Sequence, residues 1–131
     1  MTLLCVEIIS PDSLVSNYVL ETEHTLIRQK LLRKESDKLI ELEKAYNFRM
    51  KILVAEVTSG ILTIDRYLKE LKDSIRQHQS MATLFRNKGD HVMADRCVSR
   101  VKLMTQEVNS MQWKHKQKDD CILLLLYNIY I

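Results

Sequence analysis

Residues 94–111, ADRCVSRVKLMTQEVNSM, carry the clearest structural pattern of the chain. Small and apolar residues recur in this segment at spacings of 3, 4, 3, 4 and 3, and they are Ala94, Cys97, Val101, Met104, Val108 and Met111. Such spacing is a heptad pattern, which gathers these side chains on one stripe of an α-helix. The segment therefore predicts a helix that packs this stripe against another helix.

The residues before this segment predict its packing partner. Gly89 is a suitable helix terminator, because glycine adopts the left-handed conformation at little energetic cost, and Asp90 is a suitable N-cap for the next helix. Upstream, Thr63 is a good N-cap, and an apolar stripe follows it with Ile64, Leu68, Leu71 and Ile75. A tight linker between two helices of similar length places them antiparallel. We therefore expect a helical hairpin over residues 61–118.

The N-terminal half predicts one long helix over residues 12–59. Pro11 precedes Asp12 and Ser13, either of which is a suitable N-cap, and Gly60 is a suitable terminator. Its apolar stripe consists of Leu32, Leu39, Leu42, Tyr46, Met50, Leu53 and Val57. The pattern before residue 32 is less regular, so either the stripe drifts there or the helix breaks near residues 34–37.

The predicted fold class is therefore all-α: a long N-terminal helix followed by an antiparallel helical hairpin, with packing of the coiled-coil type. Only two glycines and one proline occur in 131 residues, which leaves few points where a helix is interrupted. We expect residues 1–11 to be a loosely ordered N-terminus and residues 119–131 to be an apolar tail. Its apolar part, 121–131, is about 16 Å long as a helix, too short to cross a bilayer core of about 30 Å.

The histidines, cysteines and carboxylates form no pattern that indicates chemistry. His24, His78, His91 and His115 share no helix face at spacings of three or four, so no zinc pair is indicated and each is expected at the surface. Cys97 lies in an apolar stripe and is expected to be a core residue. The sequence thus indicates no catalytic residue, metal site or cofactor site, and we expect a protein that is not an enzyme.

The charge distribution and the cysteines indicate the kind of partner and the cellular compartment to expect. Residues 1–60 have 8 Lys and Arg against 9 Asp and Glu, whereas residues 61–120 have 12 against 8. The basic surplus of the second part favours an anionic partner. Three widely spaced cysteines without a CxxC motif are typical of free thiols in a reducing compartment, so a cytoplasmic location is expected.

Basic residues gather around the predicted hairpin turn and form the candidate contact surface. This predicted basic ridge consists of Arg86, Lys88, Arg96, Arg100 and Lys102. The charge is modest and no aromatic residues alternate with it, so an acidic protein helix is a better partner than nucleic acid. An anionic membrane surface is the other candidate partner.

The segment 80–111 resembles a known helical-hairpin pattern. It has a small residue and an aromatic before Gly89 and Asp90, then Ala94, then basic residues before Met104. In these features it resembles the helical hairpin region of the lethal giant discs family, which are coiled-coil regulators of endosomal sorting. It is also similar in general form to the basic hairpins of ESCRT-III subunits. The resemblance covers about a quarter of the chain and departs from the family in having one hairpin and no lipid-binding β-sandwich.

The resemblance implies a function. In the lethal giant discs family, basic hairpin residues contact acidic helical ESCRT-III subunits, and by position this role falls here on Arg86, Lys88, Arg96 and Arg100. We therefore expect an α-helical protein-binding module, an adaptor or scaffold associated with endosomes. Two alternatives remain open: a structural coiled coil of a centrosomal or cytoskeletal assembly, which self-associates through the long helix, and a peripheral binder of anionic membranes.

Overall fold

Four α-helices and one turn of 3-10 helix make up the part of the chain that the structure describes. The computed structural model describes residues 10–117, with side chains as far as residue 112. The elements are η1 (Pro11–Ser13), α2 (Asn17–Arg33), α3 (Asp37–Thr58), α4 (Ile64–Asn87) and α5 (His91–Gln117). No strand occurs in these residues, and the expected all-α class is confirmed. The predicted apolar tail and nearly all of the predicted loose N-terminus lie outside the described residues.

The predicted single helix over residues 12–59 is wrong, because residues 34–36 separate two helices. Lys34 and Ser36 are extended, and the Ser36 side chain accepts a hydrogen bond from the Leu39 N–H at the start of α3. The first helix also begins later than expected. Ser16 is the N-cap of α2, whereas Asp12 and Ser13 lie in the preceding 3-10 turn. Ser16 and Ser36 therefore start α2 and α3 as N-caps, and neither start has a glycine or proline directly beside it.

The predicted helix ends at Gly60 and Gly89 and the predicted caps Thr63 and Asp90 are confirmed, whereas the predicted end at residue 118 lies outside the described residues. Gly60 and Gly89 both have φ of 80°, a conformation that glycine adopts without steric cost, and each follows a helix end. Thr63 caps α4 by accepting from the Arg66 N–H at 3.2 Å. Asp90 caps α5 by accepting from the Met93 N–H at 3.1 Å. These local signals set the chain reversals before and after α4.

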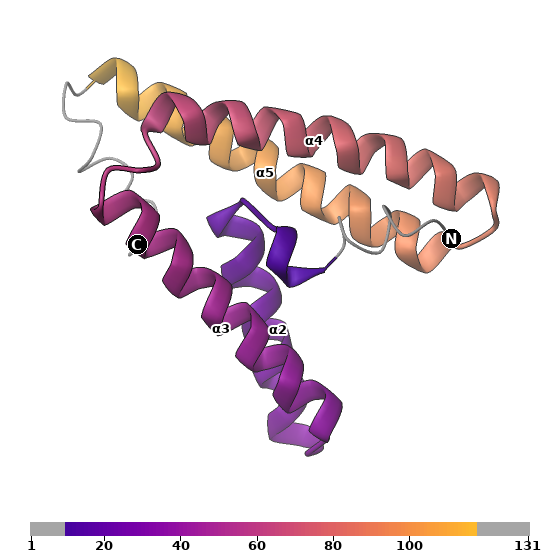
Figure 1. The fold of residues 1–131 in the computed structure, drawn as a ribbon. Helices are drawn as coiled ribbons and strands as arrows, with labels where there is room; N and C mark the ends of the chain where they lie inside the picture. The colour runs from indigo at the N-terminus through magenta and orange to yellow at the C-terminus, as the bar shows by residue number, and fades with distance from the viewer. Residues whose placement is uncertain (1–9, 118–131) are drawn as a thin grey trace.

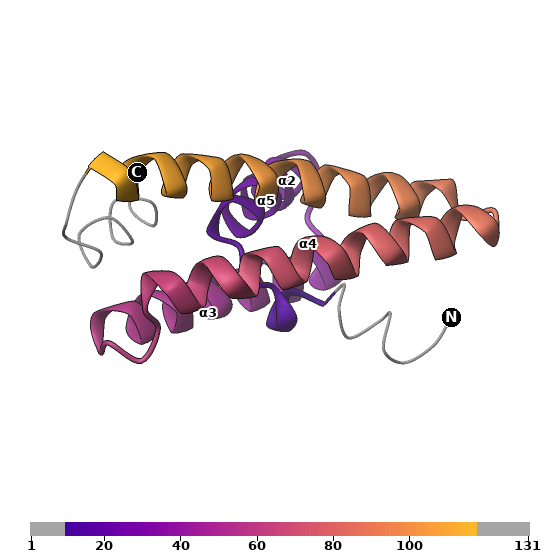
Figure 2. The ribbon, with the colours of Figure 1, turned by 90° about the horizontal axis from the view of Figure 1, so that it is seen from above.

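The four helices form two pairs. Helices α4 and α5 lie side by side along their length, joined by the short turn at Gly89 (Figures 1 and 2). This packing is compatible with the expected hairpin. Helices α2 and α3 form a second pair, here called the arm. The arm runs transversely to the α4/α5 pair, and residues 34–36, which connect α2 to α3, lie at its far end (Figure 1). Helix α2 is the part of the arm that packs against α5.

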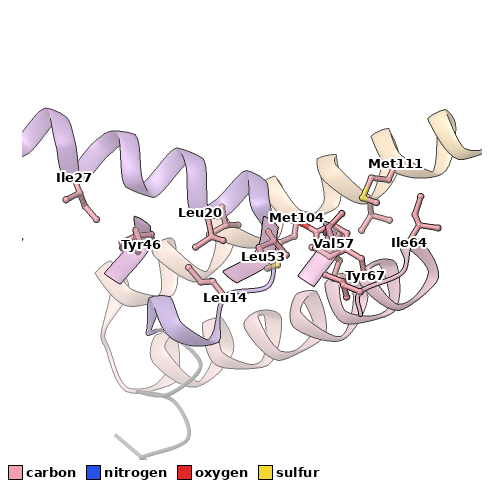
Figure 3. Packing of buried hydrophobic residues seen from close by; sticks show 14 residues of the cluster. Leu14, Leu20, Ile27, Tyr46, Leu53, Val57, Ile64, Tyr67, Met104 and Met111 are labelled. Carbon is pink, nitrogen blue, oxygen red and sulfur yellow. The ribbon is translucent and has the colours of Figure 1, made fainter. Parts of the chain in front are cut away.

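The main core lies where the arm meets the α4/α5 pair. Figure 3 shows side chains from all four helices in one cluster, together with Leu14 from the segment before α2. The labelled members are Leu14, Leu20, Ile27, Tyr46, Leu53, Val57, Ile64, Tyr67, Met104 and Met111. Most residues of the predicted stripes are buried or partly buried here, but Leu32 is 88% exposed because α2 ends just after it.

A second, smaller core lies near the turn between α4 and α5, beyond the arm. It contains Met81, Ala82 and Phe85 of α4, which pack against Ala94 and Cys97 of α5. The cluster confirms that Cys97 is a core residue. The α4/α5 pair thus has apolar packing of its own, independent of the arm.

Candidate functional site

The five residues of the predicted basic ridge lie in different surroundings. Arg86, Lys88 and Lys102 are exposed. Arg86 forms an exposed ion pair with Asp95 across the α4/α5 interface, with 3.3 Å between the charged atoms. Arg96 is on another side of α5, where its guanidinium lies 3.3 Å from the Tyr46 hydroxyl of the arm. The predicted ridge is therefore divided between an open face and a face directed at the arm.

Arg100 corrects the prediction most clearly, because its side chain is 0% exposed. Its Nε lies 2.8 Å from Oε2 of Glu23, and its second terminal nitrogen lies 2.8 Å from Oε1 of the same carboxylate. This is a two-point ion pair between α5 and α2, a geometry that suits the planar guanidinium. Arg100 is thus part of the interior and is not available on a basic ridge.

The carboxylate of Glu23 collects contacts from two further side chains. The Tyr46 hydroxyl of α3 donates to Oε1 at 2.6 Å, and a nitrogen of Arg96 lies 3.7 Å from the same oxygen. Burial alone would raise the pKa of Glu23, but the hydrogen bonds and the charge of Arg100 outweigh it, and the pKa lies below its usual value. The Glu23 carboxylate is therefore held ionised although it is mostly shielded from solvent.

His78 of α4 completes this cluster, and the expectation that it lies at the surface is wrong. It is 1% exposed, and its Nε2 lies 3.4 Å from a terminal nitrogen of Arg100, while its Nδ1 lies 2.8 Å from the Ser74 carbonyl. Burial lowers the pKa of His78, and the nearby charge of Arg100 lowers it further. We call the set Glu23, Tyr46, His78, Arg96 and Arg100 the Glu23 network; its members come from all four helices.

Glu107 of α5 forms a second buried site at the start of α2. Its Oε1 accepts from the Ser16 hydroxyl at 2.7 Å and from the Tyr18 N–H at 3.2 Å, and its Oε2 accepts from the Tyr67 hydroxyl at 2.6 Å. Burial raises the pKa of Glu107 in spite of these hydrogen bonds. We call Glu107, Ser16, Tyr18 and Tyr67 the Glu107 site; it places a carboxyl group at the N-terminus of α2.

The open face of the α4/α5 turn combines basic and apolar side chains. Val92 is 79% exposed and Val98 is 45% exposed. Val92, Asp95, Val98 and Lys102 follow one another on α5 at spacings of 3, 3 and 4, which places them on neighbouring parts of one helix face. Arg86 joins this face through its contact with Asp95. We call Arg86, Lys88, Val92, Val98 and Lys102 the tip surface.

Other kinds of site are not found in the described region. Among the described side chains, residues 10–112, no group of three or more His, Cys, Asp or Glu is arranged to hold a metal ion. No helix in that part of the chain is long and apolar enough to cross a membrane. Every buried side-chain nitrogen or oxygen there has a hydrogen-bond partner, so no polar atom is left pointing at an empty site.

The buried polar residues were missed although the sequence contains a signal for them. Leu71, Ser74, His78, Met81 and Phe85 recur on α4 at spacings of 3, 4, 3 and 4. Cys97, Arg100, Met104, Glu107 and Met111 recur on α5 in the same way. Polar residues at heptad positions are candidates for buried contacts. The local reading of Arg96 and Arg100 as an exposed pair overlooked this second stripe.

The chain matches no protein-family model, no curated protein and no solved structure.

Proposed function

We propose that this chain is a non-enzymatic α-helical protein-binding module whose tip surface binds an acidic helix of another protein. The observation that carries the proposal is the composition of that surface. Val92 is 79% exposed and Val98 is 45% exposed. They lie on the same helix as Lys102 and as Asp95, the ion-pair partner of Arg86, in a helix pair that has its own core. Exposed apolar residues beside like charges are typical of a contact surface.

The charge of the tip surface selects the class of partner. Arg86, Lys88 and Lys102 are exposed, and of these only Arg86 has an opposite charge in contact, Asp95. An acidic helix with an apolar stripe offers carboxylates to these cations and aliphatic side chains to Val92 and Val98. Arg96 is 40% exposed, so its free edge is a further contact for such a partner even though it faces the arm. Arg100 is not part of the proposed surface.

The resemblance of segment 80–111 to the lethal giant discs family supports the choice of partner and of setting. It suggests ESCRT-III subunits as acidic helical partners and a cytoplasmic, endosome-associated adaptor or scaffold as the role. In this proposal α4 and α5 form an antiparallel hairpin of the coiled-coil type, which holds the tip surface rigid. The structural coiled coil, by contrast, relied on one long helix, and residues 34–36 interrupt it.

The proposal is tested by titrating a fluorescently labelled acidic helix of an ESCRT-III subunit with the full chain and following anisotropy. The double variant Arg86→Glu/Lys88→Glu reverses two charges of the tip surface. Its matched control, Lys69→Glu/Lys72→Glu, reverses two exposed charges on the same helix, outside that surface. Circular dichroism verifies that both variants keep the parent's helicity. Binding by the parent should also weaken as salt rises, because exposed charges are screened.

We expect the tip variant to lose binding and the control to retain it. Replacing Arg86 and Lys88 by alanine should weaken binding less than glutamate does, because no repulsion is introduced. Equal binding by the parent and the tip variant would refute the tip surface. Vesicles with and without anionic lipid test the alternative: binding to anionic vesicles, with none to the peptide, would favour the membrane reading.

A further inference from the structure

His78 occupies the point where the arm meets the α4/α5 pair. Its ring lies between Ser74 on its own helix and Arg100 on α5, and Arg100 in turn holds Glu23 of α2. Glu23 also accepts from Tyr46 of α3. The imidazole is therefore connected to α2 through Arg100 and Glu23, and to α3 through the contact of Glu23 with Tyr46. Any change in its hydrogen bonding acts on the contact between the two helix pairs.

The partners of His78 fix its protonation state. A guanidinium has only donors and stays charged, so the contact at 3.4 Å requires Nε2 of His78 to be the acceptor. Its Nδ1 must then carry the proton, and Nδ1 donates to the Ser74 carbonyl at 2.8 Å. The native arrangement thus contains a neutral imidazole with both nitrogens in use. A second proton has no acceptor, because it would point at Arg100.

We propose that His78 makes the junction between the arm and the α4/α5 pair acid-sensitive: protonation of Nε2 breaks its contact with Arg100 and loosens α2 and α3 from α4 and α5. The inference goes beyond the proposed function, since it concerns the interior of the protein and not the tip surface. Two cations would face each other at a site from which water is excluded, and the nearest relief is movement of Arg100 away from the ring.

The charged groups around the ring do not remove this conflict. Arg100 of α5 is the cation in contact, and Glu23 of α2 is the one nearby carboxylate in the described region. Both oxygens of Glu23 already accept from Arg100, and one also accepts from Tyr46 of α3. Arg96 adds a second positive charge 3.7 Å from that carboxylate. The attraction of Glu23 for the imidazolium is therefore smaller than the combined effect of burial and Arg100, and the neutral form of His78 is favoured.

The arm, and not the α4/α5 pair, is the part expected to loosen. Its attachment to α5 passes through the Glu23 network, the Glu107 site and the main core, whereas α4 and α5 share a second core around Phe85 and Ala94. No titratable carboxylate or histidine belongs to that second core. Acid therefore weakens one junction and leaves the other intact.

The direction of the pH effect follows from the lowered pKa of His78. In the unfolded or released chain a histidine titrates near 6.5, whereas in the native junction the pKa lies lower. Below pH 6.5 the released form binds more protons, so the docked form loses stability as pH falls from 6.5 through the native pKa. The loss amounts to about tenfold in the docking equilibrium for each unit that separates the two pKa values.

The test combines histidine titration with hydrogen exchange on the full chain. NMR follows the ring protons of the four histidines, and the variant His78→Gln identifies the signal of His78. Hydrogen exchange then reports protection factors at pH 7 and pH 5, corrected for the intrinsic pH dependence. In the parent we expect residues 17–58 to lose protection at pH 5, by at most about thirtyfold because pH 5 lies about 1.5 units below 6.5, while the second core keeps its protection.

Two variants decide the outcome. His78→Gln cannot be protonated, so its arm should lose no protection at pH 5. The raised pKa of Glu107 favours the docked form at the lower pH, so protection should stay equal or rise. His91→Gln removes an exposed histidine and should behave like the parent. Equal acid loss in the His78→Gln variant and the parent would overturn the proposal. If His78→Gln does not fold, a pKa of His78 at or above 6.5 in the parent overturns it instead.

Discussion

Two glutamates lie at the junction of the helix pairs, Glu107 fully buried and Glu23 partly buried, and the protein accommodates them in different ways. Glu23 has a cationic partner, Arg100, which contacts both of its oxygens at 2.8 Å. Glu107 has no charged side chain in contact and is held by three neutral donors, among them the Tyr67 hydroxyl at 2.6 Å. The pKa of Glu23 is lowered and that of Glu107 is raised. A full positive charge offsets burial, whereas neutral donors and a helix N-terminus do so only in part.

The two sites together define how α2 lies on α5. The residues that contact each other are Ser16 with Glu107 and Glu23 with Arg100. Ser16 and Glu23 are seven residues apart in the sequence, and so are Arg100 and Glu107. The earlier residue of one segment contacts the later residue of the other. Two polar contacts seven residues apart on each segment fit only one placement of α2 on α5, since a shift leaves a charged group without its partner. We infer that specificity of docking is the main contribution of these polar side chains.

The largest effect is expected from removing the cation of the Glu23 network. Arg100→Leu leaves the partly buried Glu23 carboxylate with only the longer contact to Arg96 as a cationic partner, and the free energy of unfolding should fall by about 3 kcal/mol. Urea denaturation followed by circular dichroism measures it. Lys102→Leu is the control, because Lys102 is exposed two residues away and its loss should cost less than about 0.5 kcal/mol. Similar losses for both variants would mean that the ion pair is not what stabilises the junction.

Arg100 also shows what the sequence can and cannot predict. The helices, the glycine turns and the apolar stripes follow from local spacing, and Met104 and Leu53 are buried as their patterns predict. Glu23 is 77 residues away from Arg100, so their pairing has no local signal. The spacing of Arg96 and Arg100 favoured one exposed ridge, yet the arm covers one side of α5 and leaves the tip surface on the other.

The sequence carries only a weak signal for the helix break at residues 34–36. Serine lies before both α2 and α3, and each of these serines caps its helix through its side chain. Because serine also occurs inside helices, a cap without glycine or proline is a weak local signal. The break is decided by packing: it allows α3 to fold back and bury Tyr46 and Leu53 against α2 and the junction.

The second largest effect is expected at the Glu107 site. Glu107→Leu leaves the Ser16 hydroxyl, the Tyr18 N–H and the Tyr67 hydroxyl without their acceptor, while it also removes a costly buried carboxyl group. The net loss should be about 2–4 kcal/mol. Glu107→Gln keeps one carbonyl acceptor and the shape, and should cost about half as much. If glutamine destabilised more than leucine, the neutral donors would not be the reason that Glu107 is tolerated.

Tyr67 and Tyr46 each donate one hydroxyl to one of the two glutamates, so their phenylalanine variants form a matched pair with smaller expected losses of stability. Tyr67→Phe removes a hydroxyl that donates to Glu107 and accepts from the Asn17 N–H at 2.9 Å. Tyr46→Phe removes one that donates to Glu23, which keeps its two contacts with Arg100. We expect losses of about 1–2 kcal/mol at Tyr67 and about 0.5–1 kcal/mol at Tyr46. Thermal melts of the two variants under one buffer give the order, and the reverse order would contradict the contrast drawn between the two carboxylates.

The most direct test of the contrast is the pH dependence of the two carboxyl groups. The lowered pKa of Glu23 adds stability that is present above pH 4.5 and is lost as pH falls through its native pKa. The raised pKa of Glu107 works in the opposite direction: its contribution is fully present below pH 4.5 and declines as pH rises through the native pKa. Each unit of difference corresponds to about 1.4 kcal/mol.

Carbon-13 NMR of the glutamate carboxyl groups measures both pKa values in the intact chain, and Glu107→Gln assigns the second signal. The stability of the parent relative to Glu107→Gln should fall as pH rises above 4.5, because glutamine does not ionise. The same pair compared below pH 4.5 should show no slope, since Glu107 is then protonated in both states. If Glu107 titrated below Glu23, the helix N-terminus and its neutral donors would stabilise a buried carboxylate better than the guanidinium does, and the order of the two sites would be reversed.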